Sequence, residues 1–482
     1  MRKILFASSE VHPLMKTGGL ADVSASLPLA LHEQGQDVRI VMPAYRACLM
    51  ILGDVVGVAT LKLEGYLLPV EILQSRLPNS DVVLWLVNSP DHFDRDGGPY
   101  SGLEGDDWPD NAARFALFSR AIAALAMNEA GLSWQPDVLH CNDWQTGLAP
   151  ALIADEPNRP ATLFTIHNLA YQGLYSRDEF DALDLAESFW DIESLEFYSQ
   201  LSFMKGGLVF ADKITTVSPS YALEICTVEY GCGLEGLLAY RSNNGRLSGI
   251  LNGIDHDEWN PKVDRYITTP YTAKTLHKKA DNKAALQQLF ALPNEPDTFL
   301  LGFISRLVFQ KGIDLTIAAV RQLLDDGMAV QLVCLGSGDR DYERDLQMLR
   351  AHFPDEVGVR IGYDEALSHQ IEAGVDAFVM PSRFEPCGLN QLYSLRYGTL
   401  PIVRATGGLA DSVEDADGLG GGTGFQFELA TVKDMLIALK RAKALYQQPI
   451  LWRQMQINAM IRDFSWQNSA SDYLALYDEL MA

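Results

Sequence analysis

Short apolar runs alternate with longer amphipathic stretches along almost the whole chain. The runs end in small or polar residues, a pattern that is typical of buried strands. The stretches between them, such as Ala112–Glu129, Ile313–Asp325 and Val432–Tyr446, repeat their apolar positions about every 3.6 residues, as an amphipathic helix does. Strands that alternate with helices predict an α/β fold with parallel sheets and right-handed crossovers.

The predicted strands form two groups, one in each half of the chain. In the first half they are Lys3–Ala7, Val38–Met42, Val82–Val87, Val138–Cys141, Thr162–Ile166 and Lys213–Val217. In the second half they are Leu300–Ile304, Val330–Leu335, Val359–Ile361, Ala377–Met380 and Pro401–Val403. The stretch between the groups, residues 241–262 (RSNNGRLSGILNGIDHDEWNPK), is rich in Gly, Asn and Asp, as connections often are. The sequence therefore predicts two Rossmann-like domains joined in this stretch.

Composition and charge restrict the classes of function. The chain has 482 residues, 48% of them hydrophobic and 21% charged, which fits two or three globular domains. The net charge is −25 and the pI is about 4.7, so a nucleic-acid partner is not expected, because such proteins need many Lys and Arg along the phosphates. An anionic small ligand would need a local cluster of positive charge or of backbone N–H groups.

Cysteine spacing and the N-terminus indicate the compartment. The six cysteines include no CxxC pair, which argues against a disulfide framework or a structural zinc site and fits reduced thiols. The N-terminal apolar run in MRKILFASSE is too short for a signal peptide, and no later run reaches about 18 apolar residues. We therefore expect a soluble cytoplasmic protein without a membrane partner.

One hexapeptide, TGGLAD, occurs twice, at residues 17–22 and 406–411, each time after a predicted strand. In open α/β sheets, ligands bind beyond the carboxyl ends of the strands. Paired glycines let the backbone approach a ligand closely, and the N–H groups of a following helix can hold an anion. Lys16 adds a charge beside the first copy, whereas Ala405 precedes the second. The alternative is a tight strand-to-helix turn that binds nothing.

Charged residues follow two predicted strands of the second half. Arg306 and Lys311 are five residues apart across a strand-to-helix turn, and a planar guanidinium with an ammonium suits a diphosphate. The alternative is a pair of solvated surface charges. Glu385 follows Ala377–Met380 and could bind sugar hydroxyls or stabilise a developing positive charge. It could also do no more than complement the dipole of a helix start.

Other polar candidates are less specific. Asp143 and His167 each follow a predicted strand of the first half, although a lone His is more often structural. The pair Asp255 and Asp257 could bind a divalent metal, although such pairs also arise by chance.

Residues 88–111 form a long polar loop, which predicts a functional or a disordered segment. The sequence contains no Walker A, complete GxGxxG, HExxH or GxSxG motif, which weakens the corresponding enzyme classes.

A resemblance to a known family rests on ordered motifs over nearly all of the chain. These motifs are KTGGLADV (16–23), HCNDWQTGL (140–148), FTIHNLAYQG (164–173), TVSPSYALEI (216–225), GILNGID (249–255), SRLVFQKG (305–312), PSRFEPCGLNQLY (381–393), RATGGLADSV (404–413) and DFSWQNSASDYLALY (463–477). In this order they resemble the bacterial glycogen synthases and plant starch synthases, with the greater likeness to the bacterial enzymes.

The resemblance implies a GT-B fold, in which a deep cleft separates two Rossmann-like domains. It implies an N-terminal acceptor-side domain at 1–250, a nucleotide-sugar domain at 251–466, and a last helix at 467–482 that returns to the first domain. It also implies an activity, the transfer of glucose from ADP-glucose to the non-reducing 4-hydroxyl of an α-1,4-glucan such as glycogen. The anomeric configuration would be retained, ADP released, and no metal or other cofactor required. Closure of the domains would exclude water.

The resemblance also implies roles for single residues. The implied catalytic residues are Glu385, His167, Arg306, Lys311 and Asp143. The implied donor-binding residues are Lys16, Gly18, Gly19, Arg306, Lys311, Tyr363, Cys387, Gly388, Thr406, Gly407 and Gly408. The implied acceptor- and sugar-binding residues are Asp22, Asn168 and Asn252. In this assignment Arg306 and Lys311 neutralise the diphosphate, Tyr363 packs on the adenine, and His167 lies near the glucose 6-hydroxyl.

The chain departs from the family pattern at three positions. Asn142 and Gln145 stand where many members have His, and Tyr393 stands where the wider retaining GT-B pattern has a second Glu. Two other interpretations stay open: a metal-dependent sugar-nucleotide transferase that uses Asp255 and Asp257, and a non-catalytic glucan- or nucleotide-binding protein. The choice of ADP-glucose over UDP-glucose rests on the resemblance and on Tyr363.

Overall fold

The computed structural model describes residues 1–481, which divide into two compact units. Unit 1 contains Met1–Gly253 and the segment that begins at Trp466, and unit 2 contains Ile254–Ser465. The domain limits that the sequence predicted, at residues 250 and 466, lie close to these. No helix within residues 1–481 is long and apolar enough to cross a membrane.

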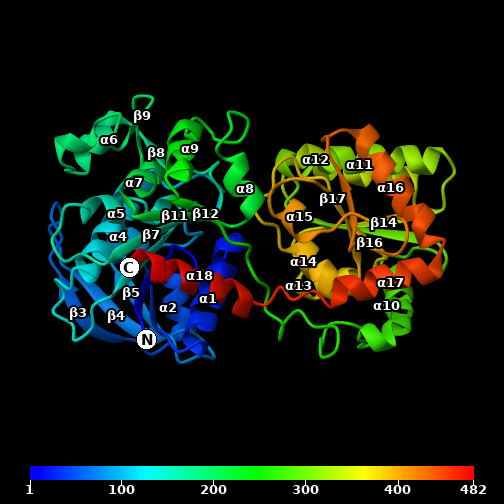
Figure 1. The fold of residues 1–482 in the computed structure, drawn as a ribbon, viewed down its shortest axis with the longest axis horizontal. Helices are drawn as coiled ribbons and strands as arrows, with labels where there is room; N and C mark the ends of the chain where they lie inside the picture. Colours follow the sequence, from blue (N-terminus) through cyan, green and yellow to red (C-terminus); the bar gives the residue numbers. More distant parts are fainter. Residues whose placement is uncertain (482) are drawn as a thin grey trace. The chain divides into compact units, whose positions relative to one another are not determined.

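A nine-stranded sheet with the order β12-β11-β7-β6-β1-β2-β5-β4-β3 forms the centre of unit 1 (Figure 1). Its strands are β1 Lys3–Ala7, β2 Asp37–Pro43, β3 Val56–Leu61, β4 Val70–Arg76, β5 Val83–Asn88, β6 Val138–Asn142, β7 Ala161–Ile166, β11 Lys213–Thr216 and β12 Leu247–Gly249. The strands from β12 to β5 in this order pair in parallel.

One edge of this sheet departs from the parallel pairing that the sequence predicted. There β3 pairs with β4, and β4 with β5, in antiparallel fashion. The chain joins these strands without a crossover helix, and antiparallel neighbours need none. The sequence analysis missed β3 and β4, because both strands are only partly buried and their residues do not form the long apolar run of a central parallel strand.

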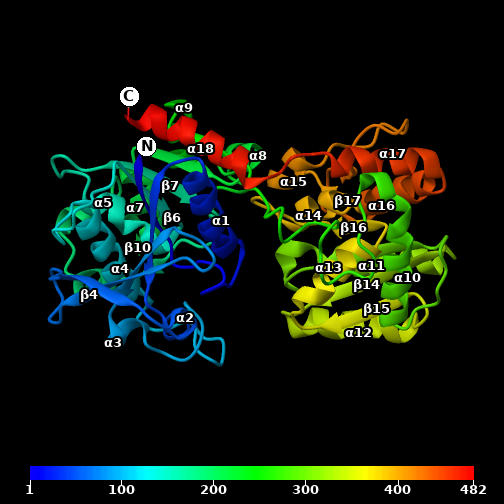
Figure 2. The same cartoon turned by 90° about the horizontal axis from the view of Figure 1, so that it is seen from below.

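Helices cover both faces of the unit 1 sheet. They are α1 Gly19–Glu33, α2 Arg46–Leu52, α3 Pro90–Phe93, α4 Asn111–Ala126, α5 Leu148–Leu152, α6 Arg177–Ala182, α7 Phe203–Phe210, α8 Pro219–Glu224, α9 Glu235–Asn243 and α18 Trp466–Met481. The first and last of these, α1 and α18, lie side by side and share one core cluster on the sheet (Figures 1 and 2). The other face is covered by α4, α5 and α7.

The last helix is held in unit 1 by polar contacts as well as by its apolar face. Tyr477 Oη lies 2.7 Å from Nδ1 of the buried His140 on β6. Ser469 Oγ donates to the carbonyl of Leu251 at 2.7 Å. The C-terminal segment therefore completes the N-terminal unit.

The long polar stretch 88–111 is ordered. It contains α3 and a bridge between Ser101 and Asp107, and the indole of Trp108 donates to the carbonyl of Gly98 at 3.2 Å.

A small antiparallel sheet of β8 Leu174–Tyr175, β10 Gln200–Ser202 and β9 Glu196–Phe197 also belongs to unit 1.

Unit 2 is built on a six-stranded sheet in the order β15-β14-β13-β16-β17-β18. The strands are β13 Phe299–Ile304, β14 Val330–Gly336, β15 Val357–Ile361, β16 Ala377–Met380, β17 Leu400–Arg404 and β18 Phe425–Phe427. All neighbouring strands pair in parallel. Numbered within the unit, the order is 3-2-1-4-5-6, which is that of a Rossmann fold.

Helices again cover both faces of this sheet. They are α10 Lys279–Leu289, α11 Ile313–Asp325, α12 Arg340–His352, α13 Glu365–Gly374, α14 Asn390–Arg396, α15 Gly407–Ser412, α16 Val432–Tyr446 and α17 Pro449–Met460. One core cluster joins the sheet to α11, α12, α16 and α17, and another joins it to α10, α13 and α15. The chain order reverses between β13 and β16, which brings the loops after these two strands together.

Candidate functional site

The loops after β13 and β16 meet at the carboxyl edge of the unit 2 sheet. The first loop carries Arg306 and Lys311, and the second carries Glu385. Gly312, at φ +67°, makes the close approach of these loops feasible, because a Cβ atom there would lie 2.2 Å from the carbonyl oxygen of Pro381. Doubly wound sheets bind ligands at the point where the strand order reverses, and the predicted donor residues stand there.

Lys311 and Glu385 form a direct ion pair at this edge. The Lys311 ammonium lies 2.8 Å from Oε1 and 2.6 Å from Oε2 of Glu385, and Ser382 Oγ donates to Oε2 at 2.9 Å. Glu385 is only 5% exposed, so the neighbouring charge and hydroxyl replace the water that its carboxylate has lost. The pair presents a cation and a hydrogen-bond acceptor side by side, as a phosphorylated sugar requires.

The second copy of the hexapeptide packs directly on the Glu385 loop. Gly407 has φ +44°, and a Cβ atom on it would lie 2.0 Å from the carbonyl oxygen of Glu385. A Cβ on Gly408 would lie 2.2 Å from the carbonyl oxygen of Cys387. These glycines allow two backbone segments to touch.

The backbone donors of the second copy are partly used within the chain. The Gly408 N–H donates to the carbonyls of Glu385 at 3.1 Å and Pro386 at 3.2 Å. Thr406 is buried, and its N–H donates to the carbonyl of Arg404 at 2.9 Å. Both N–H groups hold the loop in this structure, and the predicted role of Thr406 and Gly408 in donor binding stays a prediction.

Four further donor-site candidates of unit 2 flank the ion pair along the chain. Arg306 is exposed on the loop after β13, and Tyr363 is 78% exposed on the loop after β15. The hydroxyl of Tyr363 donates to the carboxylate of Glu365. Cys387 is buried, and Gly388, at φ +75°, continues the turn that leads into α14. The structure thus gathers the unit 2 candidates along one edge of one sheet.

The first copy of the hexapeptide lies beside a buried carboxylate that the sequence analysis missed. Glu10 Oε2 accepts the N–H groups of Thr17 at 2.5 Å and Gly18 at 3.3 Å, and Oε1 accepts the Thr17 hydroxyl at 2.7 Å. The hydroxyl of Tyr100 donates to Oε1 at 2.6 Å. The anion at this turn is a residue of the chain, so the Gly18 N–H expected to face a ligand is engaged here.

Lys16 and Asp22 flank this turn and pair with each other. The Lys16 ammonium lies 2.8 Å from Asp22 Oδ1, and both side chains are partly exposed. Gly19 begins α1, the long helix that follows the turn. The ion pair therefore places one cation at the surface beside the start of α1.

Asp143, His167 and Asn142 form a buried group at the ends of β6 and β7. The backbone N–H of His167 donates to Asp143 Oδ1 at 2.7 Å. In the side chain, Nε2 of the ring lies 2.9 Å from Asn142 Oδ1. Because Asn142 donates its amide to the carbonyl of Ala7 at 3.0 Å, its oxygen faces the ring and His167 carries its proton on Nε2. Asn142, a departure from the family pattern, thus orients His167.

Burial controls the protonation of this group. It lowers the pKa of His167 to about 3, so the ring is neutral at physiological pH and its Nδ1 is an acceptor. Burial also raises the pKa of Asp143 to about 7, although backbone N–H groups of His167 and Asn168 lower it in part. Asp143 has φ +56°, a strained conformation that often marks a functional position.

The remaining acceptor-side candidates of unit 1 lie at the ends of other elements. Asn168 follows β7, and its side-chain oxygen accepts the N–H of Ala170 at 3.1 Å. Asn252 follows β12 and is buried, and its Oδ1 has no hydrogen-bond partner among residues 1–481. An orphaned buried amide oxygen is a ready acceptor for a ligand hydroxyl.

Sequence reasoning missed Glu10, Tyr100, Ser382 and Asn142 as members of these sites. Glu10 follows β1 by three residues, and a charged residue at that place was the available signal. Tyr100 stands in the long loop 88–111, whose length alone indicated a function. The contact of Tyr100 with Glu10 spans 90 residues and follows only from the fold.

The proposed DxD pair does not gather metal ligands in the part of the chain that the structure describes. Asp255 Oδ1 accepts the backbone N–H groups of Asp257 at 2.8 Å and Glu258 at 3.2 Å, which is a local turn. The side chains that could share a cation in residues 1–481 are instead Glu258, Glu365 and His369.

Two family profiles match the chain. Residues 3–240 match the starch synthase catalytic domain, and residues 287–455 match glycosyl transferases group 1. A glycogen synthase of Thioalkalivibrio sulfidiphilus is 55% identical, and the likeness covers 100% of both chains. A glycogen synthase of Cellvibrio japonicus is 54% identical, again over 100% of both chains.

Solved structures agree in fold. The catalytic domain of starch synthase IV from Arabidopsis thaliana, bound to ADP and acarbose, is similar with a TM-score of 0.87 and 34% identity, over 100% of this chain and 99% of that one. Sucrose-phosphate synthase from Thermosynechococcus elongatus, with a TM-score of 0.61, 17% identity and coverage of 100% and 99%, shares the fold alone. The two Rossmann-like units are those of a GT-B glycosyltransferase, and the chain belongs to the family of bacterial glycogen synthases and starch synthases.

Proposed function

We propose that this glycosyltransferase moves glucose from ADP-glucose to the non-reducing 4-hydroxyl of an α-1,4-glucan such as glycogen, with retention at the anomeric carbon and release of ADP. The observation that carries the proposal is the Lys311–Glu385 pair at the point of unit 2 where the strand order reverses. Relatives named glycogen synthase, and a related starch synthase bound to ADP and acarbose, support the choice of substrates.

Unit 2 would hold the donor. Arg306 and Lys311 neutralise the diphosphate, and Tyr363 offers an exposed ring for the adenine. Glu385, with the backbone after Cys387, accepts and donates hydrogen bonds to the glucose hydroxyls. In this assignment Gly407 has a supporting role, since it lets α15 lie against the Glu385 loop.

Unit 1 would contribute neutral hydrogen-bonding groups and one cation. His167 is neutral and can accept the glucose 6-hydroxyl at Nδ1, whereas its one ring proton is on Nε2 and is donated to Asn142. Asp143, Asn168 and the orphaned oxygen of Asn252 offer acceptors for sugar hydroxyls. Lys16, beside Asp22, is a second cation for the diphosphate.

The chemistry follows from this division of roles. The bond between the anomeric carbon and the phosphate oxygen breaks, and cations stabilise the charge that develops on ADP. The acceptor 4-hydroxyl attacks from the same face, and the departing phosphate oxygen takes its proton, so a covalent nucleophile and a metal ion are both unnecessary. Exclusion of water prevents hydrolysis of the oxocarbenium-like sugar. We propose that the reaction takes place in the cytoplasm.

The test measures ADP release from ADP-glucose and from UDP-glucose, each with and without glycogen. We expect release that depends on glycogen, is faster with ADP-glucose and survives EDTA. Loss of activity in EDTA would favour the metal-dependent alternative, and glycogen binding without ADP release would favour a non-catalytic protein. Lys274→Ala, an exposed lysine of the same unit, is the control for changes at Lys311 and should leave the rate unchanged.

A further inference from the structure

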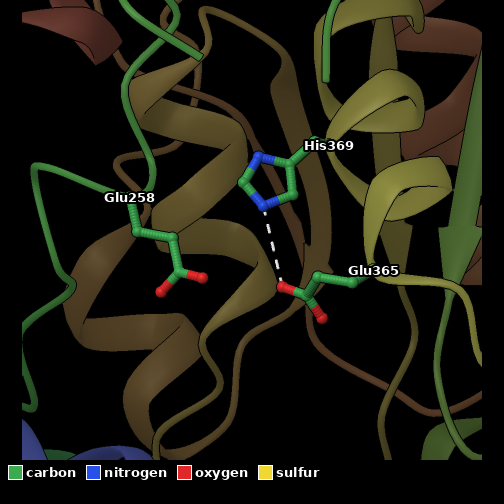
Figure 3. Close-up of side chains that lie close together, drawn as sticks. All are labelled: Glu258, Glu365 and His369. Carbon is green, nitrogen blue, oxygen red and sulfur yellow. Dashed lines mark ion pairs between the residues drawn. The ribbon is translucent and has the colours of Figure 1, made fainter. Parts of the chain in front are cut away.

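Three potential metal ligands converge in unit 2 outside the proposed transfer residues. Glu258 belongs to the segment that opens the unit, and Glu365 and His369 lie one turn apart on α13 (Figure 3). One donor atom of each residue lies within 4.8 Å of the other two. Figure 3 shows the two carboxylates on the side of the imidazole that carries Nε2.

The imidazole of His369 is fixed in the orientation of a metal ligand. Its side chain is 1% exposed, and its ring stacks on Trp259 with centroids 3.9 Å apart. Nδ1 lies 2.8 Å from Asp264 Oδ2, and Asp264 also accepts the hydroxyl of Tyr397 at 2.6 Å. A carboxylate on one ring nitrogen is the usual support of a histidine whose other nitrogen binds a metal.

The other nitrogen of His369 points into the cluster without a hydrogen bond. Nε2 is buried and has no hydrogen-bond partner among residues 1–481, and its ion-pair distance to Glu365 Oε1 is 3.6 Å. A buried ring nitrogen left in this state calls for an explanation, since almost all such groups are satisfied. The gap between the two atoms is too long for a hydrogen bond and suits a bridging ion.

Charge points to a cation. Three carboxylates, of Asp264, Glu258 and Glu365, lie around one imidazole. A divalent cation bound among them would offset two of these three negative charges.

We propose that Glu258, Glu365 and His369 form a binding site for a divalent transition-metal cation of the Zn²⁺ class. One nitrogen and two carboxylate oxygens are ligands that such ions accept at about 2.0–2.2 Å, which places neighbouring ligand atoms roughly 3.4 Å apart. His369 Nε2 and Glu365 Oε1 already have nearly this separation. Glu258 is exposed, and its ligand atom lies within 4.8 Å of the other two.

A metal here would act as a clamp and not as a catalyst. It would join the segment around Glu258 to α13, across the stack of Trp259 on His369. The site goes beyond the proposed sugar transfer, which needs no metal. Its test measures metal binding and not turnover, so either proposal can be disproved while the other stands.

The test titrates metal-free full-length protein with Zn²⁺ by calorimetry and with Co²⁺ by visible absorption. The chain has nine His and six Cys, so other sites contribute, and the comparison between variants is decisive. Glu258→Gln removes one ligand at the surface without disturbing the buried histidine. Asp257→Asn removes the same charge one residue away and is the matched control.

We expect Glu258→Gln to lose one Zn²⁺ equivalent or to bind it at least about tenfold more weakly, with loss of the Co²⁺ absorption of that site. Asp257→Asn should bind as wild type does, and Zn²⁺ should raise the melting temperature of wild type by about 3 °C or more. Anomalous scattering at the zinc edge in crystals should place the ion between the three side chains. Equal binding by wild type and Glu258→Gln, or equal weakening by both variants, would overturn the proposal and leave only the His369–Glu365 ion pair.

Discussion

The two copies of TGGLAD have the same sequence and opposite structural demands. In the first copy the turn is exposed at Gly18, and a Cβ atom on that residue would meet nothing within 4 Å. In the second copy Gly407 is buried, has φ +44°, and would place a Cβ atom 2.0 Å from a backbone oxygen. Glycine is thus a steric necessity in one copy and not in the other.

The backbone donors of the two copies are also used differently. The first copy directs its N–H groups to the Glu10 side chain, which could be exchanged for a ligand group. The second copy directs the N–H of Gly408 to the main-chain carbonyls of Glu385 and Pro386, which fixes the loop that carries the Lys311–Glu385 pair. A shared motif therefore predicts a shared turn but not a shared role.

The largest expected effect comes from adding one methyl group to each copy. Gly407→Ala combines a strained φ with overlap against the Glu385 carbonyl, and we expect a cost of about 4 kcal/mol or more in the stability of unit 2. Gly18→Ala should cost less than about 1 kcal/mol, because its φ of −158° suits any residue and its surroundings are open. Chemical denaturation of the two variants gives the difference, and equal losses would remove the distinction between the copies.

The next comparison removes one lysine from each unit. Lys311→Ala leaves the buried carboxylate of Glu385 without its cation, and we expect kcat/KM for ADP-glucose to fall by roughly 10³-fold. Lys16→Ala breaks a pair with the partly exposed Asp22, and we expect a loss of roughly 10-fold. Steady-state rates of ADP release measure both losses of kcat/KM. A Lys311→Ala enzyme with near-normal turnover would contradict the role given to the unit 2 edge.

Protonation acts in opposite directions at two neighbouring residues of unit 1. Asp143 has a pKa of about 7 when folded against an ordinary value of 3.8, so the folded state holds the extra proton and its contribution to stability falls as pH rises from about 4 to 7. His167 has the opposite effect on the pH dependence of stability. Its pKa is lowered to about 3 in the folded state, so its contribution to stability rises as the pH increases from about 3 to 6.5.

Asp143→Asn isolates the first of these contributions. The amide keeps an acceptor for the His167 N–H but does not titrate, so wild type should lose stability relative to the variant between pH 4 and 7, by roughly 3–4 kcal/mol. Denaturant unfolding at several pH values measures the difference. A constant difference across that range would show that Asp143 titrates normally in the folded protein.

The sequence predicted the sheets better than the contacts between strand ends. Buried parallel strands are continuous apolar runs, as in β14, whose seven residues are all buried, and the ends of α11 and α16 agree with the predicted helices. The placement of Lys311 and Glu385 after strands was also predictable. Their contact was not, since it joins residues 74 apart and depends on the strand order.

The partners of two acids outside the recognised motifs, Glu10 and Glu258, were beyond sequence reasoning. A glutamate in a loop is normally solvated, and nothing in the pattern around Glu10 or Glu258 marks a partner. Each acquires its role from a residue far along the chain, Tyr100 for Glu10 and His369 for Glu258. Such roles follow from tertiary packing, which a single sequence does not display.

The smallest predicted effect tests whether the Glu10 side chain organises the first copy. Glu10→Gln keeps the shape but replaces one carboxylate oxygen by an amide that cannot accept the N–H groups of Thr17 and Gly18, so we expect a loss of about 1–2 kcal/mol in unit 1. Hydrogen exchange at the Thr17 and Gly18 amides should quicken, while exchange at the Gly408 amide stays unchanged, because main-chain carbonyls hold that group. If all three amides exchange as in wild type, the turn at Thr17 and Gly18 is held by its own backbone, and the first copy resembles the second more closely than its contacts indicate.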